Sequence, residues 1–370
     1  MKQKKVKKRK KVKKVKQKKV KPRKKKESLK KKNNIMFRKL EKYLPVTLFI
    51  IIALGIFGVT LTLTIFNIYS KEDYQIDSLL FVNPLTGEKT KELIEYNPVA
   101  IMIENATDIR PQFGLDKASI VYEALVEGGI TRLMGIYNYS DEVAKIGPVR
   151  SLRAYFLDWA LEYDPALFHV GGSPGSLEAI KDYSIIDINE MSGDEIYYDR
   201  GSRYDWPHNV YTNSQLWSEI SSLKDREIEY IANEYNYSKS VECPQEPEIL
   251  IDYSYYNYQV QWIYNCEDNL YYRYNGGVEF TDHEGKQITS DKVIVQFVKS
   301  WLIDIERLGM QTLGTGKTVI FQNGKVVEGY WEKEDKELKT QYYTNQDELI
   351  LLKPGKTWIQ IIPPLTNINF

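Results

Sequence analysis

The chain has 370 residues, and its 51 basic and 50 acidic side chains leave a formal net charge of +1. This length allows one to three domains and a sizeable buried core. The two cysteines, Cys243 and Cys266, form no CxxC or Cys/His spacing, which excludes the common structural zinc sites. The near-neutral net charge is the sum of a strongly basic N-terminal stretch and an acidic remainder of the chain.

Residues 1–42 are predicted to be a disordered, basic, cytoplasmic tail. Within residues 1–32 there are 21 Lys or Arg and one acid, Glu27, so this stretch carries about +20. It has too few apolar side chains to offset the entropy lost on folding. Its role stays open between a topology determinant, contact with anionic lipid headgroups and nonspecific contact with nucleic acid, of which the last is the least favoured.

Residues 43–70 contain no charged side chain over 28 positions and predict a single transmembrane helix. At 1.5 Å per residue, the most apolar 20 to 24 positions span roughly 30 to 36 Å, the thickness of a hydrocarbon core. The stretch lacks the short apolar run and small-residue cleavage site of a secretory signal, so we expect it to be retained. Because Lys and Arg crowd its N-terminal side, we expect a single-pass protein of the cell membrane with that end in the cytosol.

Residues 71–96 are polar and predict a spacer, and residues 97–240 predict an α/β domain with a mixed sheet and helices. Its first strand is expected to end at Ile103. Two β-compatible runs then flank Gly128 and Gly129, which predicts a hairpin with a two-residue turn. That register pairs Glu127 with Ile130, Leu125 with Arg132 and Glu123 with Met134. It would place Glu123, Glu127 and Arg132 on one face.

Ser151 is predicted to cap a helix whose apolar side chains follow at helical spacing. A buried strand at residues 166–170 runs into the loop Gly171-Gly172, after which Ser173 is placed to cap a second helix. A short strand at residues 184–188 precedes a long aromatic stretch, and a further helix is expected to start at Ser214.

From about residue 246 the sequence changes to tyrosine-rich alternation with glycine turns, so residues 241–370 predict a β-rich second domain. If this part lies in an oxidising compartment, Cys243 and Cys266 can form a cross-strand disulfide. The sequence leaves the bridged and the free states open. The fold class is therefore an α/β first domain plus a β-rich second domain behind one N-terminal transmembrane helix.

Several long motifs resemble a known family. They are ENATDIRPQFGLDKASIVYEALVEGGITRL, IGPVRSLR, FHVGGSPG, PHNVYTN and the closing GKTWIQIIPP. Together they are similar to the YerB-like family of Gram-positive envelope proteins, from about Phe81 to Pro364. The resemblance implies an N-terminal and a C-terminal domain, and many members are lipoproteins. This chain departs from that pattern because no lipobox cysteine follows its apolar run, so a transmembrane helix is expected in place of the lipid.

Arginines are concentrated in the motif region although the part after the apolar stretch is acidic. Arginine suits bidentate recognition of carboxylate or phosphate, which points to a local anion site, whereas internal ion pairs are the equally weighted alternative. Backbone N–H groups of the glycine loop could contribute, although such loops are often purely structural. The predicted ligand-binding residues are Arg132, Arg150, Arg153, Arg200, Arg203, Gly171, Gly172, Ser173 and Asn209.

The candidate catalytic residues are Glu127, Glu123 and His208. Two glutamates four positions apart on a strand are separated by roughly 13 Å, which is too far for a paired-carboxylate glycosidase. One of them could still act as a lone general acid with Arg132 or His208 nearby. His169, inside an apolar strand, is predicted to be a core histidine with its hydrogen bonds satisfied.

The sequence thus predicts an extracytoplasmic envelope protein with an anionic-ligand pocket that binds peptidoglycan or a related anionic wall polymer. The alternative is an enzyme that cleaves or modifies wall glycan. We expect no cofactor and no metal. The expected partners are the cytoplasmic membrane, the wall polymer and further envelope proteins, and nucleic acid is not expected.

Overall fold

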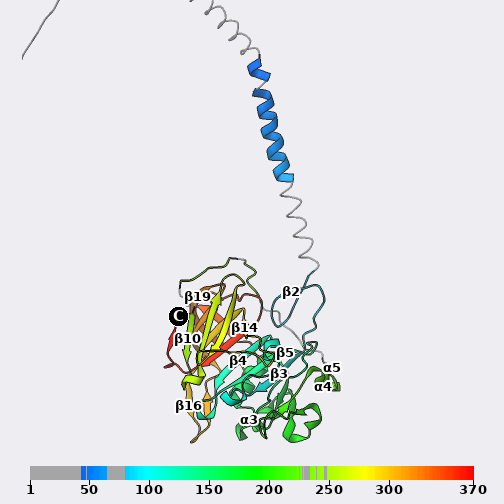
Figure 1. The fold of residues 1–370 in the computed structure, drawn as a ribbon, viewed down its shortest axis with the longest axis vertical. Coiled ribbons are helices and arrows are strands. Elements are labelled where there is room, and N and C mark those ends of the chain that lie inside the picture. The colour runs from blue at the N-terminus through cyan, green and yellow to red at the C-terminus, as the bar shows by residue number, and fades with distance from the viewer. Residues whose placement is uncertain are drawn as a thin grey trace, which may run out of the picture. The chain divides into compact units, whose positions relative to one another are not determined.

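The computed structural model describes residues 43–46, 48–64, 80–224, 226, 228, 234–238, 240–245 and 248–370. The tail predicted for residues 1–42 lies outside these residues. The chain divides into two compact units, Met1–Leu79 and Leu80–Phe370. Figure 1 shows the helix of the first unit in blue and the elements of the second from cyan to red.

The described part of the first unit is an apolar helix, Tyr43–Thr64, that is long and apolar enough to cross a membrane by length and composition. Its few polar side chains bond within the helix itself. The hydroxyl groups of Thr62 and Thr64 donate to the carbonyl oxygens of Gly58 and Thr60, at 3.0 and 2.8 Å. These bonds leave few polar groups in need of water, which suits an apolar surrounding.

The second unit is built on one ten-stranded sheet in the order β20-β19-β18-β15-β21-β4-β5-β3-β6-β7. Its strands come from both predicted domains. Those from the first are β3 (Pro98–Ile103), β4 (Ile120–Leu125), β5 (Thr131–Asn138), β6 (Ala166–His169) and β7 (Ile186–Asn189). Those from the second are β15 (Lys292–Phe297), β18 (Gly314–Gln322), β19 (Lys325–Lys333), β20 (Gln341–Thr344) and β21 (Thr357–Ile362).

The two groups of strands join where β21 pairs with β4 in parallel, with Thr357 opposite Ile120. Strand β21 also runs parallel to β15, and β3, β6 and β7 are parallel to one another. Because β3 and β4 are both antiparallel to β5, all six of these strands point the same way. Their carboxyl ends therefore meet at one edge of the sheet, here called the carboxyl edge.

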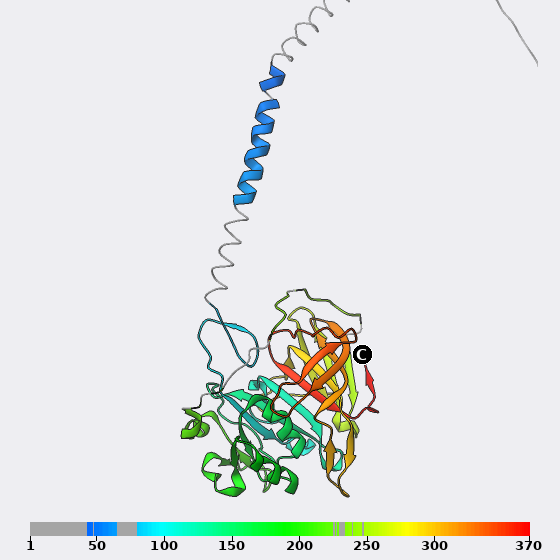
Figure 2. The ribbon, with the colours of Figure 1, turned by 180° about the vertical axis from the view of Figure 1, so that it is seen from behind.

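A smaller six-stranded sheet belongs to the β-rich region and covers one face of the large sheet. Its strands β11 (Gln259–Asn265) and β12 (Leu270–Asn275) alternate between buried and half-buried side chains, the period-two pattern of a sheet with one face buried. The other members are β10 (Glu248–Asp252), β13 (Val278–Glu279), β14 (Thr289–Ser290) and β22 (Ile368–Asn369). Figure 2 shows these layers from behind.

The opposite face of the large sheet is covered by helix α2 (Ala154–Ala160) and the turn that follows it. The Trp159 ring stacks on Tyr122 of β4 at a centroid distance of 5.7 Å. The prediction that Ser151 caps this helix was wrong, because the cap position is Arg153 and its side chain makes no capping bond. The other helices are α3 (Pro174–Ala179), α4 (Ser214–Ser218) and α5 (Ser221–Lys224).

The hairpin of β4 and β5 has a different register from the predicted one. Leu125 pairs with Thr131 and Glu123 with Leu133, a shift of one residue. The turn is longer because Glu127–Gly129 forms a 3-10 turn that Val126 and Ile130 close with a backbone hydrogen bond of 2.8 Å. A shift of one residue exchanges the two faces, so Glu123 and Arg132 lie on opposite sides of the sheet.

Cys243 and Cys266 form a disulfide with a Cα–Cα distance of 5.5 Å. Among the described residues of the second unit there are also three two-stranded pairs. They are β1 (Phe81–Val82) with β2 (Lys89–Thr90), β8 (Asp199–Arg200) with β9 (Val210–Tyr211), and β16 (Ser300–Leu302) with β17 (Leu308–Met310). The first pair lies within the segment predicted as a spacer.

Candidate functional site

The motif segments from the first domain converge on the carboxyl edge of the ten-stranded sheet. Glu104 follows the last residue of β3, Glu127 lies two positions after β4, and Gly171 lies two positions after β6. In open sheets with parallel strands, ligands bind outside the carboxyl ends of the strands. The carboxyl edge is therefore the place in this fold where the predicted residues could form a common site.

An extended segment, residues 146–153, brings two arginines, Arg150 and Arg153, to this edge. The N–H of Arg150 donates to the carbonyl oxygen of Met102, and that of Val149 to the carbonyl oxygen of Val210. The N–H of Leu152 then donates to the carbonyl oxygen of Gly171 at 3.0 Å. The segment is thus held between the end of β3, the strand β9 and the glycine loop, which fixes where the two arginine side chains start.

Glu104 is the centre of the first charged group. Its carboxylate forms an ion pair with Arg150 and accepts from Nδ1 of His208 at 3.0 Å. The Glu104 side chain is 4% exposed, whereas that of His208 is 35% exposed. The arrangement orients the imidazole of His208 from a buried carboxylate and leaves part of the ring open to solvent. A histidine held in this way can act as an acid or base.

Glu127 and Arg153 form the second charged group. Nε and Nη2 of Arg153 donate to the two carboxylate oxygens of Glu127 at 2.6 and 2.7 Å, a bidentate pair. Burial alone would raise the pKa of Glu127, but the hydrogen bond and charge of Arg153 outweigh it and lower the pKa below its usual value. Glu127 is therefore held in its ionised form.

Arg132 lies beside both groups and is buried. Its Nη1 donates to the carbonyl oxygen of Ser151 at 2.8 Å. Burial, then the charge of Arg153 and to a lesser degree that of Arg150, lower the pKa of Arg132 to about 10 despite the opposing effect of Glu104. Three guanidinium groups thus lie near two carboxylates at the carboxyl edge, which leaves a local excess of positive charge.

The glycine loop is a structural neighbour of this cluster. Ser173 caps α3 through a hydrogen bond from the N–H of Ser176, as predicted, but the helix has six residues. The N–H of Gly171 donates to Oδ1 of Asn189 at 2.9 Å, so it is engaged within the protein. His169 is wholly buried and contacts the Gly171 carbonyl and Asp187 through its two ring nitrogens, which confirms it as a core histidine with both nitrogens hydrogen-bonded.

Arg200, Arg203 and Asn209 form a more exposed extension. Arg200 makes an ion pair with Glu190 and donates to Oδ1 of Asn209 at 3.0 Å. Nη1 of Arg203 lies 2.7 Å from Nδ1 of His283. The structure therefore joins the group of Glu104, Arg150 and His208 to the pair of Glu127 and Arg153 through Arg132, which lies between them. Arg200, Arg203 and Asn209 contact other partners.

Glu123 is separated from the cluster because it lies on the other face of the sheet. It is fully buried and forms an ion pair of 2.9 Å with Arg273 of β12, which is also fully buried. Sequence reasoning did not identify Arg273. The signal was present, since period-two alternation in β12 places Arg273 at an inward position between Tyr271 and Asn275. A charged side chain at such a position predicts a buried partner.

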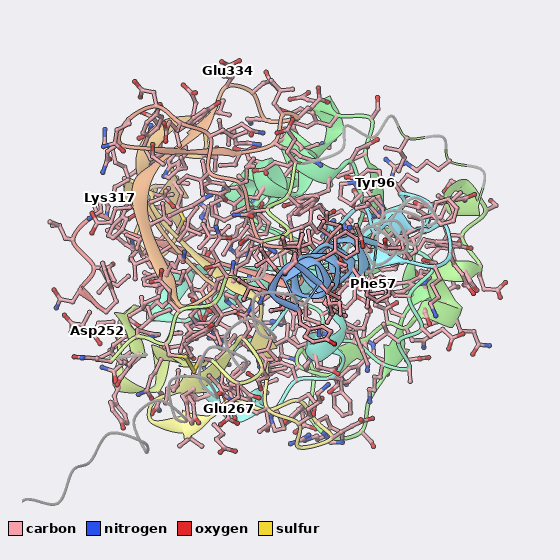
Figure 3. All side chains as sticks on the ribbon, turned by 90° about the horizontal axis from the view of Figure 1, so that it is seen from above. Phe57, Tyr96, Asp252, Glu267, Lys317 and Glu334 are labelled. Atoms are coloured by element: carbon pink, nitrogen blue, oxygen red, sulfur yellow. A yellow bond between two sulfur atoms is a disulfide. The ribbon has the colours of Figure 1, made fainter. Side chains whose placement is uncertain are left out.

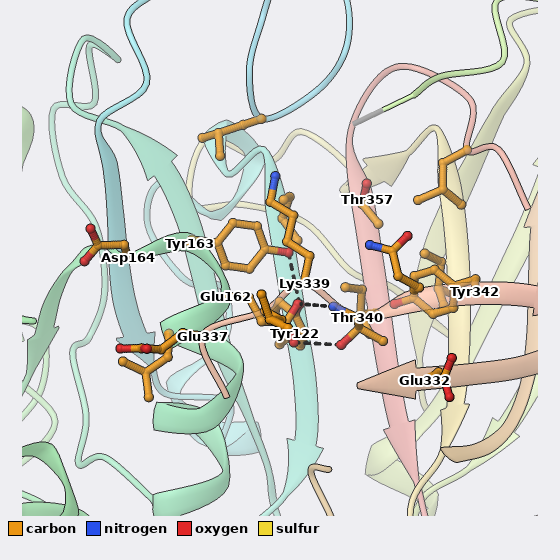
Figure 4. A pocket seen from close by; sticks show the side chains of 18 of the residues that line it. Tyr122, Glu162, Tyr163, Asp164, Glu332, Glu337, Lys339, Thr340, Tyr342 and Thr357 are labelled. Atoms are coloured by element: carbon orange, nitrogen blue, oxygen red, sulfur yellow. Dashed lines mark hydrogen bonds between the residues drawn. The ribbon is translucent and has the colours of Figure 1, made fainter. Parts of the chain in front are cut away.

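A cavity of about 880 Å³ lies elsewhere, over the face of the sheet that α2 covers. Figure 4 shows Glu162 and Tyr163, which follow α2, beside Lys339, Thr340 and Tyr342 from the β-rich region. Among the described residues, no group of three or more His, Cys, Asp or Glu side chains is arranged to hold a metal ion.

Two family descriptions match this chain. "Protein of unknown function (DUF3048) N-terminal domain" matches residues 85–228, and the corresponding C-terminal domain matches residues 249–359. The chain is 31% identical over 289 residues to a Bacillus subtilis (strain 168) protein named "Putative lipoprotein YerB", covering 76% of this chain and 86% of that protein.

The crystal structure of the YerB protein from Bacillus subtilis is also similar. Its TM-score is 0.69 at 30% sequence identity, and the match covers 78% of this chain and the whole of that one. The 78% of this chain that the match covers is close to the share that Leu80–Phe370 makes up, so this fragment is the natural choice for experiments on the second unit. The matches to both domains and to this relative show that the chain belongs to the DUF3048 family, as a homologue of YerB.

Proposed function

We propose that this protein is an envelope protein, anchored by the helix Tyr43–Thr64, whose second unit binds an anionic wall polymer at the carboxyl edge. The helix is long and apolar enough to span, and the basic residues before it favour a cytosolic N-terminus. The second unit is then extracytoplasmic. The lipoprotein name of the relative and the disulfide between Cys243 and Cys266 agree with that location.

The position of Arg132 carries the binding proposal. A buried guanidinium whose pKa is lowered by burial and by Arg153 gains from an additional negative charge nearby. Glu104 and Glu127 supply two negative charges against the three positive charges of the arginines. A carboxylate or phosphate group of a ligand would neutralise the remaining positive charge. Peptidoglycan carboxylates, and the phosphates of polymers attached to it, are the anions that an extracytoplasmic protein of this kind would meet.

Cleavage or modification of a wall glycan is the second candidate, and the pair of Glu104 and His208 favours it. The Nδ1 contact of 3.0 Å orients an imidazole that is partly open to solvent. The glutamates are less suited to the acid role. Arg153 keeps Glu127 ionised, whereas a general acid must carry a proton, and Glu123 is fully buried. Binding is therefore the better-supported function.

Cosedimentation of the Leu80–Phe370 fragment with wall sacculi tests both candidates. Arg153→Gln should weaken binding about tenfold, which corresponds to about 1.4 kcal/mol. Arg307→Gln is the matched control, because Arg307 is also ion-paired but lies on the β16–β17 hairpin with a 40% exposed side chain. Thermal unfolding of each variant shows whether it is folded.

Sacculi with and without their attached anionic polymers separate the two sources of anion. If the fragment binds only sacculi that carry the attached polymer, the ligand is a phosphate group. If it also binds sacculi without that polymer, the ligand is a peptidoglycan carboxylate. If the unsubstituted fragment releases soluble glycan fragments and His208→Ala does not, the result would support the enzymatic function. Unchanged binding by the folded Arg153→Gln variant would remove the carboxyl edge from consideration.

A further inference from the structure

The cavity over the α2 face of the large sheet lies away from the carboxyl edge. Ile120, Lys292 and Thr357 line it, and they are the first residues of β4, β15 and β21. Because these three strands are parallel, the cavity lies toward their amino ends. Its volume of about 880 Å³ is in the range of small-molecule pockets, and its lining comes from both family regions.

Aliphatic side chains form both the floor and part of the mouth of the cavity. Ile120, Ile294 and Ile359 belong to neighbouring strands and are buried in the floor. Leu338 and Leu349 also line the cavity but are 50% and 43% exposed, so they mark where it opens to solvent. An apolar ligand at the mouth would remove this leucine surface from water, which is favourable.

The hydroxyl groups of the tyrosines in the cavity are engaged within the protein. The hydroxyl oxygens of Tyr122 and Tyr163 lie 3.0 Å apart, and that of Tyr342 accepts from Nε2 of Gln296 at 2.7 Å. The hydroxyl group of Tyr96 donates to the carbonyl oxygen of Tyr163 at 2.9 Å. Figure 4 shows three of these rings beside one another in the cavity. Their apolar ring faces are therefore what they offer to a ligand.

The buried charged groups of the cavity also have partners within the protein. Glu162 accepts from the N–H and Oγ1 of Thr340 at 3.1 and 2.8 Å, as the dashed lines in Figure 4 show, and forms an ion pair of 3.0 Å with Lys333. Nζ of Lys292 donates to the carbonyl oxygen of Gly355 at 2.8 Å. Within the described part of the chain, none of the buried side-chain atoms that lack a hydrogen bond belongs to a lining residue. The cavity therefore has no buried polar group that requires a ligand.

The charges of the lining disfavour an anionic ligand. Glu332 of β19 and Glu334 and Glu337 of the loop after it line the cavity, and Figure 3 shows Glu334 at the outer rim of the folded unit. Lys292 and Lys339 are the lysines of the lining, and both already interact with other groups of the protein. Burial lowers the pKa of Lys292 to about 7 and that of Lys339 to about 8, so both lose their charge more readily than an exposed lysine. An anionic head group would thus meet three carboxylates and two weakened cations.

The internal hydrogen bonds of the cavity distinguish between polar and apolar ligands. A ligand rich in hydroxyl groups would give up its hydrogen bonds to water and find the polar groups of the interior already bonded to one another. An apolar chain or ring gives up no such bonds. It covers the isoleucine, leucine and tyrosine surfaces, and its gain grows with the apolar area that it removes from water.

We propose that this cavity binds an apolar chain, such as an acyl or prenyl chain, that carries no anionic head group. The inference goes beyond the proposed wall-polymer function, because it concerns other residues and another class of ligand. Leu338 and Leu349 are the most informative lining residues, since their side chains are exposed and their replacement should leave the sheet intact.

Fluorescence titration of the Leu80–Phe370 fragment with N-phenyl-1-naphthylamine, an uncharged apolar dye, provides the test. The fragment contains every residue that lines the cavity, and a cooperative thermal transition establishes beforehand that it is folded. The dye should bind at micromolar concentration with a rise in fluorescence. Decanol should displace it, decanoate, which has the same chain and an anionic head, should displace it less readily, and maltose should leave it bound.

The two exposed leucines supply the variant. Leu338→Asn combined with Leu349→Asn should weaken dye binding about tenfold, which corresponds to about 1.4 kcal/mol. Leu365→Asn is the matched control, because Leu365 is 95% exposed and does not line the cavity. It should bind the dye as the unsubstituted fragment does.

Vesicles separate the two sources of an apolar chain, a bilayer lipid and a free molecule. The fragment is incubated with vesicles of dioleoylphosphatidylcholine that contain monooleoylglycerol, recovered, and analysed by mass spectrometry. Bound monooleoylglycerol would identify a bilayer lipid as the source. A fragment that binds decanol but takes no lipid from the vesicles would identify a free apolar molecule.

Three outcomes would overturn the proposal. They are no binding of the dye or of decanol, equal dye binding by the folded double leucine variant, and displacement of the dye by maltose or decanoate at lower concentrations than by decanol. Arg153→Gln separates this site from the carboxyl edge. The proposal expects Arg153→Gln to bind the dye normally, whether or not it still binds sacculi, and lost dye binding in this folded variant would also count against it.

Discussion

Glu123 and Arg273 form an ion pair of 2.9 Å in which both side chains are fully buried. They come from β4 of the large sheet and β12 of the small one, so the pair joins the two sheets across the core. Oγ1 of Thr131 and Nε1 of Trp358 also donate to the carboxylate of Glu123, at 2.8 and 3.1 Å. The carboxylate of Glu123 is thus held by a network that spans the two family regions.

Glu123→Gln should destabilise the second unit by about 3–5 kcal/mol, because it leaves the guanidinium of Arg273 buried without a compensating charge. Urea unfolding of the Leu80–Phe370 fragment measures this loss. Glu328→Gln is the control. Its pair with Lys317 is about half exposed on both sides, so less than about 1 kcal/mol should be lost there. Equal losses in the two variants would contradict a structural role for the Glu123 pair.

Lys292 predicts a pH dependence of stability. Burial lowers its pKa to about 7 in the folded protein, whereas an unfolded lysine titrates near 10.4. Between these values the unfolded chain binds more protons than the folded one. The free energy of unfolding should therefore rise with pH from 7 to 9, by up to about 1.4 kcal/mol per pH unit from this group.

Lys292→Met isolates that contribution, since methionine keeps the length of the side chain and does not titrate. Urea unfolding at pH 7, 8 and 9 should give a smaller slope for Lys292→Met than for the unsubstituted fragment. Lys317→Met, which removes a half-exposed lysine, should leave the slope unchanged. An unchanged slope of the free energy of unfolding against pH in Lys292→Met would show that the Lys292 amine is charged in the folded state.

The disulfide between Cys243 and Cys266 spans 23 residues. Closing a loop of this size restricts the unfolded chain and should contribute about 3 kcal/mol. The double variant Cys243→Ser, Cys266→Ser should therefore unfold at a lower urea concentration than the oxidised fragment. The reducing agent dithiothreitol should produce the same shift in the unsubstituted fragment and none in the double variant. If dithiothreitol also shifted the unfolding of the double variant, the shift in the unsubstituted fragment could not be attributed to the disulfide.

The apolar helix Tyr43–Thr64 gives a prediction about location. The full-length chain should remain with membranes after a carbonate wash, and the Leu80–Phe370 fragment, expressed without the helix, should be released. Protease added to intact cells after removal of the wall should digest the second unit if it is extracytoplasmic. Protection in those cells and digestion in lysates would place that unit in the cytosol and would remove the wall-polymer proposal.

Much of the local structure could be predicted from the sequence because its signals are short-range. Ser173 before Pro174 marks a helix start, and the structure confirms this cap. The helix expected at Ser214 starts there, with Asn213 as its cap. The tyrosine-rich alternation from about residue 246 predicted β structure, and β11 and β12 show the matching period-two pattern of burial. Each of these signals depends on residues within a few positions of one another.

The parts that could not be predicted depend on contacts distant in sequence. Gly128 and Gly129 suit a two-residue turn, but both have positive φ in a longer turn that starts at Glu127, and this one difference moved Glu123 to the other face. The partner of Glu123 lies 150 residues away. The gathering of Arg150 and His208 around Glu104 likewise requires the order of strands in the large sheet, which short-range signals do not specify.

The position of β21 between β15 and β4 has a consequence for biosynthesis. A chain is synthesised from its N-terminus, so β4 is made long before residues 357–362 are available to pair with it. Until then one edge of β4 has no partner from β21 and could pair with another chain. Chaperones or folding factors would therefore matter most during this interval, and a chain that stops before residue 357 would keep the edge open.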